Sequence, residues 1–523
     1  MNHRIRNLAV ILGLLSGVII IWFTGAFASE PGEMIQQTGR PPKIDPDYSD
    51  VMLPPNIAPC NFMIQESGIR YRVEIRDSSG NHIRIVSKNP IIRIPEKKWR
   101  QLLNANPGHT ITIHIDAMNT TRVWQRYHPI TNRIASEPID SHLVYRLLKD
   151  PIFEHYQEMG IFQRDLTNYQ VTPVLQYKTI KSCFNCHAFQ QNDPDRMLIH
   201  VRGGKAGGTL LVQNSKVFKL DTRTPFNSAP GAYRSWHPDG KLIAFSVNRV
   251  YQFFHATGSP RDVYDAASDL ILYDIEKNRV TSCPKIATRE RMETYPEWSS
   301  DGRTLYFCSA PSIDHNLDIQ YQYQDIRYDL MCIPYHSKNG TWGDPVTVLS
   351  AAKAGRSITH PKVSPDGRFL LFCLSDYGNF TIYRKGGDLY ILDIETGTVR
   401  EMPFNSDQPD SYHCWSSNSR WFAFSSKRRT GITTQIYFSY VDRNGQFYKP
   451  FVLPQKDPTI YDRSFDTFNV PELITGPVKI RPQVLTRTAF NNERMIKAGM
   501  DPDLEAEAIT RATEKTQKTQ PLQ

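Results

Sequence analysis

Two cysteines and a histidine stand together at Cys183, Cys186 and His187, in the stretch KSCFNCHAF. Their spacing, Cys-x-x-Cys-His, is the attachment signal for a c-type haem. Each thiol adds to one vinyl group of the porphyrin, and the adjacent imidazole binds the iron on the proximal side. The reaction needs reduced thiols in an exported protein. The motif therefore predicts one haem c, anchored at Cys183 and Cys186 and coordinated by His187.

Other chemistry is open to the same three side chains. A Cys-x-x-Cys pair also forms disulfides or thioredoxin-like redox pairs, and two thiolates with an imidazole can hold zinc. A thioredoxin-like pair belongs in a βαβ context, which the surrounding sequence lacks, and a closed zinc site needs a fourth ligand at a recognisable spacing. We favour haem, with zinc and a plain disulfide as the alternatives.

The sixth ligand of a haem iron decides between electron transfer and catalysis, because a Met or His there closes the site, whereas an open position admits a small substrate. His413 and Met159 are the two candidates for this distal position. Each also has a plain structural interpretation, His413 as a hydrogen-bonded turn residue and Met159 as a flexible core residue.

The N-terminus carries an export signal. Arg4 and Arg6 precede an uncharged apolar run at residues 8–27, and this order of charge and hydrophobicity directs the following chain across a membrane. The run is long enough to span a bilayer, whereas Ala26-Phe27-Ala28 would suit signal peptidase. We favour an inner-membrane anchor with the remaining chain in the periplasm or cell envelope, and cleavage stays open.

Composition narrows the class of protein. Eight cysteines in 523 residues are too few for a disulfide scaffold. The net charge of +9 is spread along the chain, which argues against nucleic acid and is compatible with an acidic protein partner. The most basic run, at residues 427–429, is expected to be a solvated face.

A repeated unit occupies more than half of the chain. HPDGKLIAFS, SSDGRTLYFC, SPDGRFLLFC and SSNSRWFAFS each place a turn before an alternating apolar strand, and the turns at Asp239, Asp301, Asp366 and Asn418 are spaced by 62, 65 and 52 residues. A second hairpin follows each unit, and a degenerate unit, NDPDRMLIHVRGG, precedes them. Four strands per unit predict a β-propeller. The cysteine motif should lie before the first strand of the first blade, beside one mouth of the central channel.

The chain divides accordingly into five segments. We expect a signal or anchor helix at 1–28, a Pro-rich extended tether at 29–59, and a β-rich domain at 60–178, with an immunoglobulin-like sandwich as the favoured arrangement. Short helices are expected there at PEKKWRQLL and SHLVYRLL. A propeller of five or six blades follows at 179–485, and a helical or disordered tail at 486–523 docks through Leu504 and Ile509.

The repeats WHPDGKLIAFS, YPEWSSDGRTLYF, HPKVSPDGRFLLF and YHCWSSNSRWFAF resemble those of TolB-like propellers with WD40-like Pro-Asp-Gly repeats, a likeness specific for fold. Together with MGIFQRDLTNYQ, CFNCHAF and LSDYGNFTIY, they also resemble a group of anchored Bacteroidota envelope proteins described as cytochrome c-like. That resemblance implies the same architecture and offers no established reaction.

Three functions follow from these patterns. The leading hypothesis is an exported monohaem c-type cytochrome that exchanges electrons with an envelope partner. A haem reductase or peroxidase would require a distal His, Arg or Tyr placed to handle protons, and the sequence shows no such constellation. A haem-free propeller scaffold that binds a protein or glycan is the remaining alternative.

Overall fold

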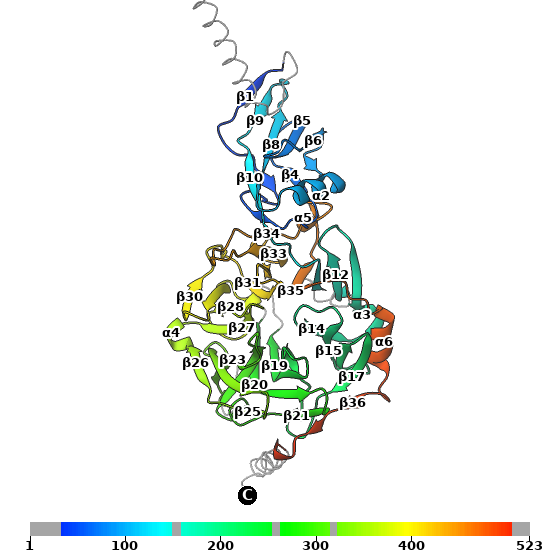
Figure 1. Cartoon of the computed structure of the whole chain (residues 1–523), viewed down its shortest axis with the longest axis vertical. Helices are drawn as coiled ribbons and strands as arrows, with labels where there is room; N and C mark the ends of the chain where they lie inside the picture. The colour runs from blue at the N-terminus through cyan, green and yellow to red at the C-terminus, as the bar shows by residue number, and fades with distance from the viewer. Residues whose placement is uncertain (1–32, 149–157, 254–261, 314–321, 505–523) are drawn as a thin grey trace, which may run out of the picture.

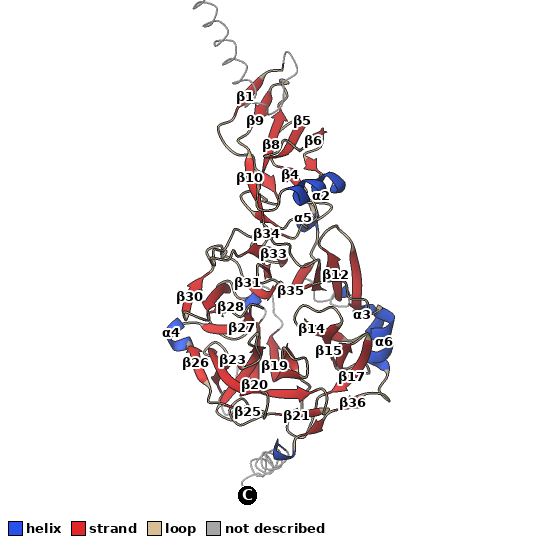
Figure 2. Ribbon diagram, viewed as in Figure 1, coloured by secondary structure: helices blue, strands red, loops and turns tan. Residues whose placement is uncertain are grey.

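A computed structural model of the chain describes residues 33–148, 158–253, 262–313 and 322–504. The expected anchor at residues 8–27 and its cleavage motif lie outside this set. Within the described ranges, no helix is both long and apolar enough to cross a membrane. Strands dominate the molecule, and helices are few and short (Figure 2).

The first domain packs two sheets beside the propeller (Figure 1). The seven-stranded sheet consists of β1 (Ile35–Gln37), β3 (Met52–Leu53), β5 (Arg70–Asp77), β6 (His82–Ser87), β8 (Thr110–Met118), β9 (Trp124–Arg126) and β10 (Ile130–Ile134). The smaller sheet consists of β2 (Ile44–Asp45), β4 (Phe62–Ile64) and β7 (Ile91–Ile92). The expected β-rich domain is therefore present. Its larger sheet includes two parallel pairs, β1–β9 and β3–β10, which a purely antiparallel immunoglobulin sandwich does not have.

The expected helix at PEKKWRQLL is α2 (Glu96–Ala105), whose Trp99, Leu102 and Leu103 are buried at helical spacing. The Pro-rich segment before this domain is not a tether from residue 33 onward. Tyr48 and Leu53 are buried in the domain's core, at 1% and 0% exposure. This part of the chain adds strands to the sheets because its apolar side chains, though irregularly spaced, reach the core.

Six sheets of the described chain form the propeller. In ring order they contain β35 (Thr467–Ile474), β11 (His142–Leu148), β12 (Gly160–Asp165) and β13 (Val171–Gln176); β14 (Cys183–Phe189), β15 (Arg196–Arg202), β16 (Gly208–Gln213) and β17 (Lys216–Asp221); β18 (Ala232–Trp236), β19 (Leu242–Phe253), β20 (Asp262–Asp274) and β21 (Arg279–Thr281); β22 (Arg291–Trp298), β23 (Thr304–Pro311), β24 (Asp329–His336), β25 (Thr341–Trp342) and β26 (Val346–Leu349); β27 (Ser357–Val363), β28 (Phe369–Ser375), β29 (Asp388–Asp393) and β30 (Thr398–Glu401); and β31 (Asp410–Trp415), β32 (Trp421–Ser426), β33 (Gln435–Tyr440) and β34 (Phe451–Val452).

The inner strands β14, β18, β22, β27, β31 and β35 contact one another in this order and close a ring. The β-propeller fold is thus confirmed, with six blades. Short helices α3 (Tyr177–Ile180), α4 (Ala351–Ala354), α5 (Ile460–Arg463) and η3 (Thr381–Tyr383) lie in the connections.

Closure of the ring joins distant parts of the chain. Strand β35 pairs antiparallel with β11, so the first blade combines the end of the propeller sequence with residues 142–176. The predicted boundary at residue 179 therefore falls one blade too late. The predicted helix at SHLVYRLL is wrong for the same reason, because this segment is β11, where Leu143 and Tyr145 face one core and Val144 another.

The last repeat unit has Asn418-Ser419 where the other units have Asp-Gly, and it keeps the same turn geometry. Gly240, Gly302 and Gly367 have φ of 74°, 71° and 76°, and Ser419 takes the same place with φ of 60°. This left-handed conformation suits glycine and costs other residues free energy. The fully folded hairpin at residues 416–421 holds Ser419 there, with the Ser416 hydroxyl accepting from the backbone N–H of Trp421 at 3.1 Å.

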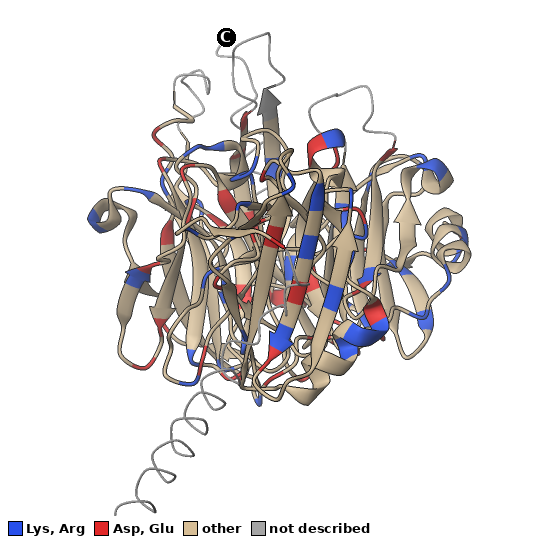
Figure 3. Cartoon of the chain, turned by 90° about the horizontal axis from the view of Figure 1, so that it is seen from above, with Lys and Arg blue, Asp and Glu red and all other residues tan. Residues whose placement is uncertain are grey.

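The last blade binds the first domain through polar and apolar contacts. The Arg429 guanidinium donates to both carboxylate oxygens of Asp45, at 2.6 and 2.5 Å. Trp421, fully buried, donates its indole N–H to the Glu137 carbonyl at 3.0 Å and belongs to a core shared by the two domains. The predicted solvated face at residues 427–429 is therefore wrong at Arg429, and Arg428 pairs with Asp410 at 2.8 Å. Elsewhere, charges of both signs are interspersed over the ribbon (Figure 3).

The tail lies along the outside of the propeller (Figure 1). After α6 (Pro482–Phe490), β36 (Ile496–Lys497) extends the second blade at β17, and β37 (Gly499–Met500) extends the third at β21, both parallel. Leu504 is 4% exposed in the core of these blades, so docking through Leu504 is confirmed. Ile509 lies outside the described residues.

Candidate functional site

Each inner strand of the propeller carries a β-bulge at the same level of the ring. In five blades the bulge contains a bulky residue with positive φ: Tyr233 (20°), Tyr295 (50°), His360 (56°), Tyr412 (40°) and Val470 (48°). Such conformations cost about 1–3 kcal/mol each and cluster at functional sites, and bulges re-aim side chains. The ring of bulges therefore points to the axis of the propeller as the functional site.

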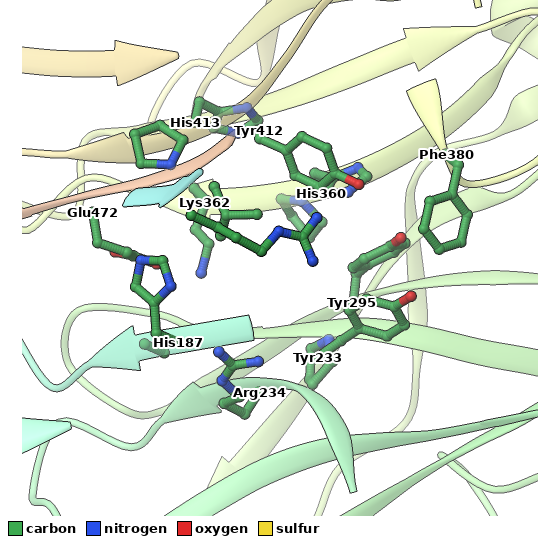
Figure 4. A pocket seen from close by; sticks show the side chains of 16 residues that line it. His187, Tyr233, Arg234, Tyr295, His360, Lys362, Phe380, Tyr412, His413 and Glu472 are labelled. Atoms are coloured by element: carbon green, nitrogen blue, oxygen red, sulfur yellow. The ribbon is translucent and has the colours of Figure 1, made fainter. Parts of the chain in front are cut away.

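The bulged residues border a cavity of about 120 Å³ on the axis. Four aromatic rings form an arc, since Tyr233 lies 4.6 Å from Tyr295, Tyr295 lies 4.2 Å from His360, and His360 lies 4.9 Å from Tyr412, measured between ring centroids. Phe380, from the fifth blade, stands next to this arc (Figure 4). The other wall carries His187, His413 and several charged side chains.

The His187 side chain lines this cavity from β14 (Figure 4). It is 1% exposed, and within the described chain neither ring nitrogen has a hydrogen-bond partner. Burial, with the nearby charge of Arg234, lowers the pKa of His187 to about 3, although backbone groups of Val144 and Val470 oppose the shift without forming regular hydrogen bonds. The imidazole is therefore neutral at pH 7, with lone-pair and N–H capacity unused, which is the state needed to bind a metal or a ligand.

The cysteines of the motif lie on the same inner strand, and not before it as predicted. In the ladder of β14 with β15, a bulge separates Phe184 from Cys186. Alternate pairs of a ladder share a face, so Cys183 and Cys186 occupy positions on one face of the sheet, and His187 occupies a position on the other. Cys183 is half-buried. A haem bonded to both cysteines and to His187 needs three positions on one side of the strand, which this extended register does not provide.

The two distal candidates have different surroundings. His413 is brought to the cavity of His187, on β31, but its Nε2 lies 3.0 Å from the Leu371 carbonyl and its Nδ1 lies 3.7 Å from the Cys373 thiol. Burial lowers the pKa of His413 to about 3. Met159 is 5% exposed in the apolar core between the first two blades and does not line the cavity. Met159 is therefore a core residue as expected, whereas His413 is hydrogen-bonded as expected but lies on a strand and not in a turn.

Charged side chains lie between this cavity and a second, neighbouring cavity. Arg234, Lys362 and Glu472 line both, and the second cavity has a volume of about 300 Å³. Lys362 binds the Glu297 carboxylate at 3.0 Å. Burial lowers the pKa of Lys362, but the carboxylates of Glu297 and Glu472 outweigh it and leave this pKa raised. Burial raises the pKa of Glu472 to about 7 against the charges of Lys362 and Arg234.

The side chains at this site fit the cofactors that the motif suggests only in part. Among the side chains that the structure describes, no three from His, Cys, Asp and Glu gather in a way that could hold a metal ion. The neutral His187 suits an axial haem ligand, and the cationic side chains suit the carboxylates of a porphyrin. The axial donor therefore fits haem, whereas the register of the two cysteines fits covalent attachment only after β14 changes its conformation.

Most of the residues that line the cavity could not be identified from the sequence. The sequence patterns singled out none of Tyr233, Tyr295, His360 and Tyr412 as site residues. One signal existed: each of these four residues stands six positions before the Asp or Asn of its repeat turn. Arg146 and Glu472 had no such signal, because they belong to the blade that closes the ring.

Comparison with known proteins supports no family assignment. No protein-family model and no curated protein sequence matches the chain. Among solved structures, it is similar to an oligogalacturonate lyase in complex with manganese (14% identity over 59% of this chain and 73% of that one, TM-score 0.34). It is also similar to a putative 6-phosphogluconolactonase from Bacteroides uniformis (11%, 79% and 99%, TM-score 0.30) and to the Dos1 propeller (11%, 53% and 63%, TM-score 0.32). These likenesses do not extend to function, and the fold rests on the strand pairing described above.

Proposed function

We propose that the protein is an exported, monohaem c-type cytochrome of the cell envelope, built on a six-bladed propeller. The observation that carries this proposal is the His187 imidazole, which is buried, neutral and without a hydrogen-bond partner on either ring nitrogen in the described chain. Buried polar groups of this kind are rare unless a cofactor, ion or water completes them. The adjoining Cys-x-x-Cys motif supplies the reason to choose haem.

In this proposal, His187 is the proximal ligand, and Cys183 and Cys186 are the covalent anchors. When bound, haem c supplies a one-electron redox centre. The chain's own contribution is to bury the imidazole and keep it uncharged, and the cationic side chains that line the cavity would pair with the carboxylates of the porphyrin. Attachment of both thiols implies that residues 183–187 leave the strand register of β14.

The cellular setting is part of the same proposal. Residues 8–27 would hold the protein at the inner membrane, with the propeller in the periplasm. Its redox partner would be another envelope protein, and one face of the propeller would supply the docking surface. A reductase or peroxidase activity has less support, because His413, the histidine opposite His187, has both ring nitrogens occupied by neighbouring groups.

A second function is favoured by a different observation. The strand register of β14 places the cysteines on the face opposite His187, and the cavity of about 120 Å³ is smaller than the roughly 300–1,000 Å³ of most cofactor sites. Both features suit a haem-free propeller that binds a partner or a small ligand in its channel.

The intact mass of the purified protein decides between these functions. The protein is produced in a host with c-type haem maturation, beside a Cys183→Ala/Cys186→Ala variant and a Cys332→Ala control, which removes a half-buried thiol outside the motif. We expect a mass gain of one haem and a Soret band in the wild type and the control, lost in the double variant. A His187→Ala variant should keep the added mass but change the reduced spectrum. A wild type without added mass or Soret band would refute the cytochrome proposal in favour of the haem-free one.

A further inference from the structure

Arg234 is a buried arginine without a counter-ion in contact. It is 7% exposed, and its Nε is buried without a hydrogen-bond partner. None of the hydrogen bonds or ion pairs formed within the described chain includes its guanidinium. Figure 4 shows this group pointing into the cavity on the side of His187. The other guanidinium nitrogens face the cavity, where water or a bound anion completes them, because a largely buried charge without a hydrogen-bonded partner is costly.

The neighbouring charges do not supply that compensation. Arg146, Arg234 and Lys362 line the cavity as cations, against the carboxylate of Glu472. Lys362 is paired with Glu297 at 3.0 Å, whereas Glu472 forms no hydrogen bond or ion pair within the described chain. Burial also raises the pKa of Glu472 to about 7, so this carboxylate is partly protonated at neutral pH. Arg234 is therefore the cation of this cavity that the neighbouring carboxylates leave without a contact.

The wall residues and the volume of the cavity indicate which ligands fit beside Arg234. Tyr233, Tyr295, Phe380 and Tyr412 line it with aromatic surface. Its volume of about 120 Å³ is close to the roughly 150 Å³ of a protein cavity that takes up benzene. A single six-membered ring is thus a planar body of a size that fits this space.

We propose that the cavity binds a planar single-ring carboxylate, whose carboxylate pairs with Arg234 and whose ring lies against the aromatic arc. The planar fork of a guanidinium matches a carboxylate in a bidentate pair, and aromatic side chains bind planar rings by offset or edge-to-face contact. The inference stands on Arg234 and the cavity and does not rest on haem binding. A carboxylate of a bound haem is a second source of the same chemistry, which the experiment separates.

Calorimetric titration with benzoate tests this proposal, with benzamide as its uncharged counterpart of the same shape. The haem-free wild type should bind benzoate at least about 30-fold more tightly than benzamide, because the loss of a buried charge pair costs about 2 kcal/mol or more. Arg234→Gln should weaken benzoate binding by a similar factor, and Arg234→Lys by less. Arg303→Gln removes the same charge from a side chain that is 84% exposed and should change nothing.

Equal binding of benzoate and benzamide, undetectable benzoate binding, or unchanged binding in Arg234→Gln would each overturn the proposal. The comparison of the two ligands uses the wild type alone, so it holds even when the Arg234→Gln variant unfolds, which circular dichroism reports. The same titration of haem-loaded protein identifies the source. Loss of benzoate binding there assigns the pairing to a haem carboxylate, and retained binding assigns it to a free organic acid.

Discussion

Asp265 should make the protein less stable as the pH rises, and its replacement by asparagine should remove this effect. The side chain is 1% exposed on β20, and three donors converge on its Oδ2: the amides of Asn248 at 2.7 Å and Asn379 at 2.6 Å, and the hydroxyl of Tyr328 at 3.5 Å. Its Oδ1 has no partner in the described chain. Burial raises the pKa of Asp265 to about 7, against these hydrogen bonds.

The sign and size of the effect follow from this pKa. The folded protein holds the Asp265 proton more tightly than the unfolded chain, whose carboxyl titrates near pH 4. The free energy of unfolding therefore falls as the pH rises from about 4 to about 7, and stays level above that. A rise of about three pKa units corresponds to about 4 kcal/mol. Because asparagine is neutral throughout, Asp265→Asn should gain about 4 kcal/mol relative to the wild type between pH 4 and pH 8.

Urea unfolding of the two proteins, followed by tryptophan fluorescence across this pH range, measures that difference. All other titrations are common to both and cancel in the comparison. The same substitution at Asp325, which is exposed, controls for the chemical change itself. A difference between Asp265→Asn and the wild type that stays flat from pH 4 to pH 8 would show that Asp265 is ionised in the fold, and the reasoning from burial would fail.

Two further predictions concern the contacts that hold the propeller to its neighbours. Trp421→Ala should destabilise the protein by about 3–5 kcal/mol, because it leaves a cavity in the core shared by the last blade and the first domain. Thermal unfolding measures this loss, with Trp342→Ala as a control at a half-buried tryptophan. Equal losses of stability in the two variants would contradict the prediction. Lys219→Met should cost about 1–3 kcal/mol, because the Lys219 ammonium donates to the Ala489 carbonyl at 2.6 Å and the Asn492 side chain at 2.5 Å. Hydrogen exchange should then quicken in α6, and unchanged exchange would show that packing alone holds this helix.

The repeated units could be predicted because each contains its own evidence. A polar turn with glycine in the left-handed conformation, followed by strict alternation, specifies a hairpin without reference to the remaining chain. Even the irregular unit at Asn418-Ser419 keeps this geometry, with Ser419 at φ of 60°. The hairpins in turn need neighbours to cover both faces, which leads to a ring of blades.

The first blade could not be predicted in the same way. SHLVYRLL has apolar residues that suit a helix as well as a strand, and nothing local chooses between them. The choice is made by β35, more than 300 residues away, which pairs with β11 from His142 to Leu148. The Pro-rich segment before the first domain shows the same limit, since Tyr48 and Leu53 are buried by strands that follow much later.

The site also depends on this distant pairing. His187 stands between blades, so its burial is complete only when β35 closes the ring beside β14. The strained residues are coupled in the same way, because Tyr295 contacts Tyr233 on one side and His360 on the other. A bulge that costs free energy within one strand is stabilised by the rings of the adjacent blades. The sequence motif at residues 183–187 therefore indicates which ligands the chain could bind, and closure of the ring determines whether the His187 imidazole is buried, neutral and available.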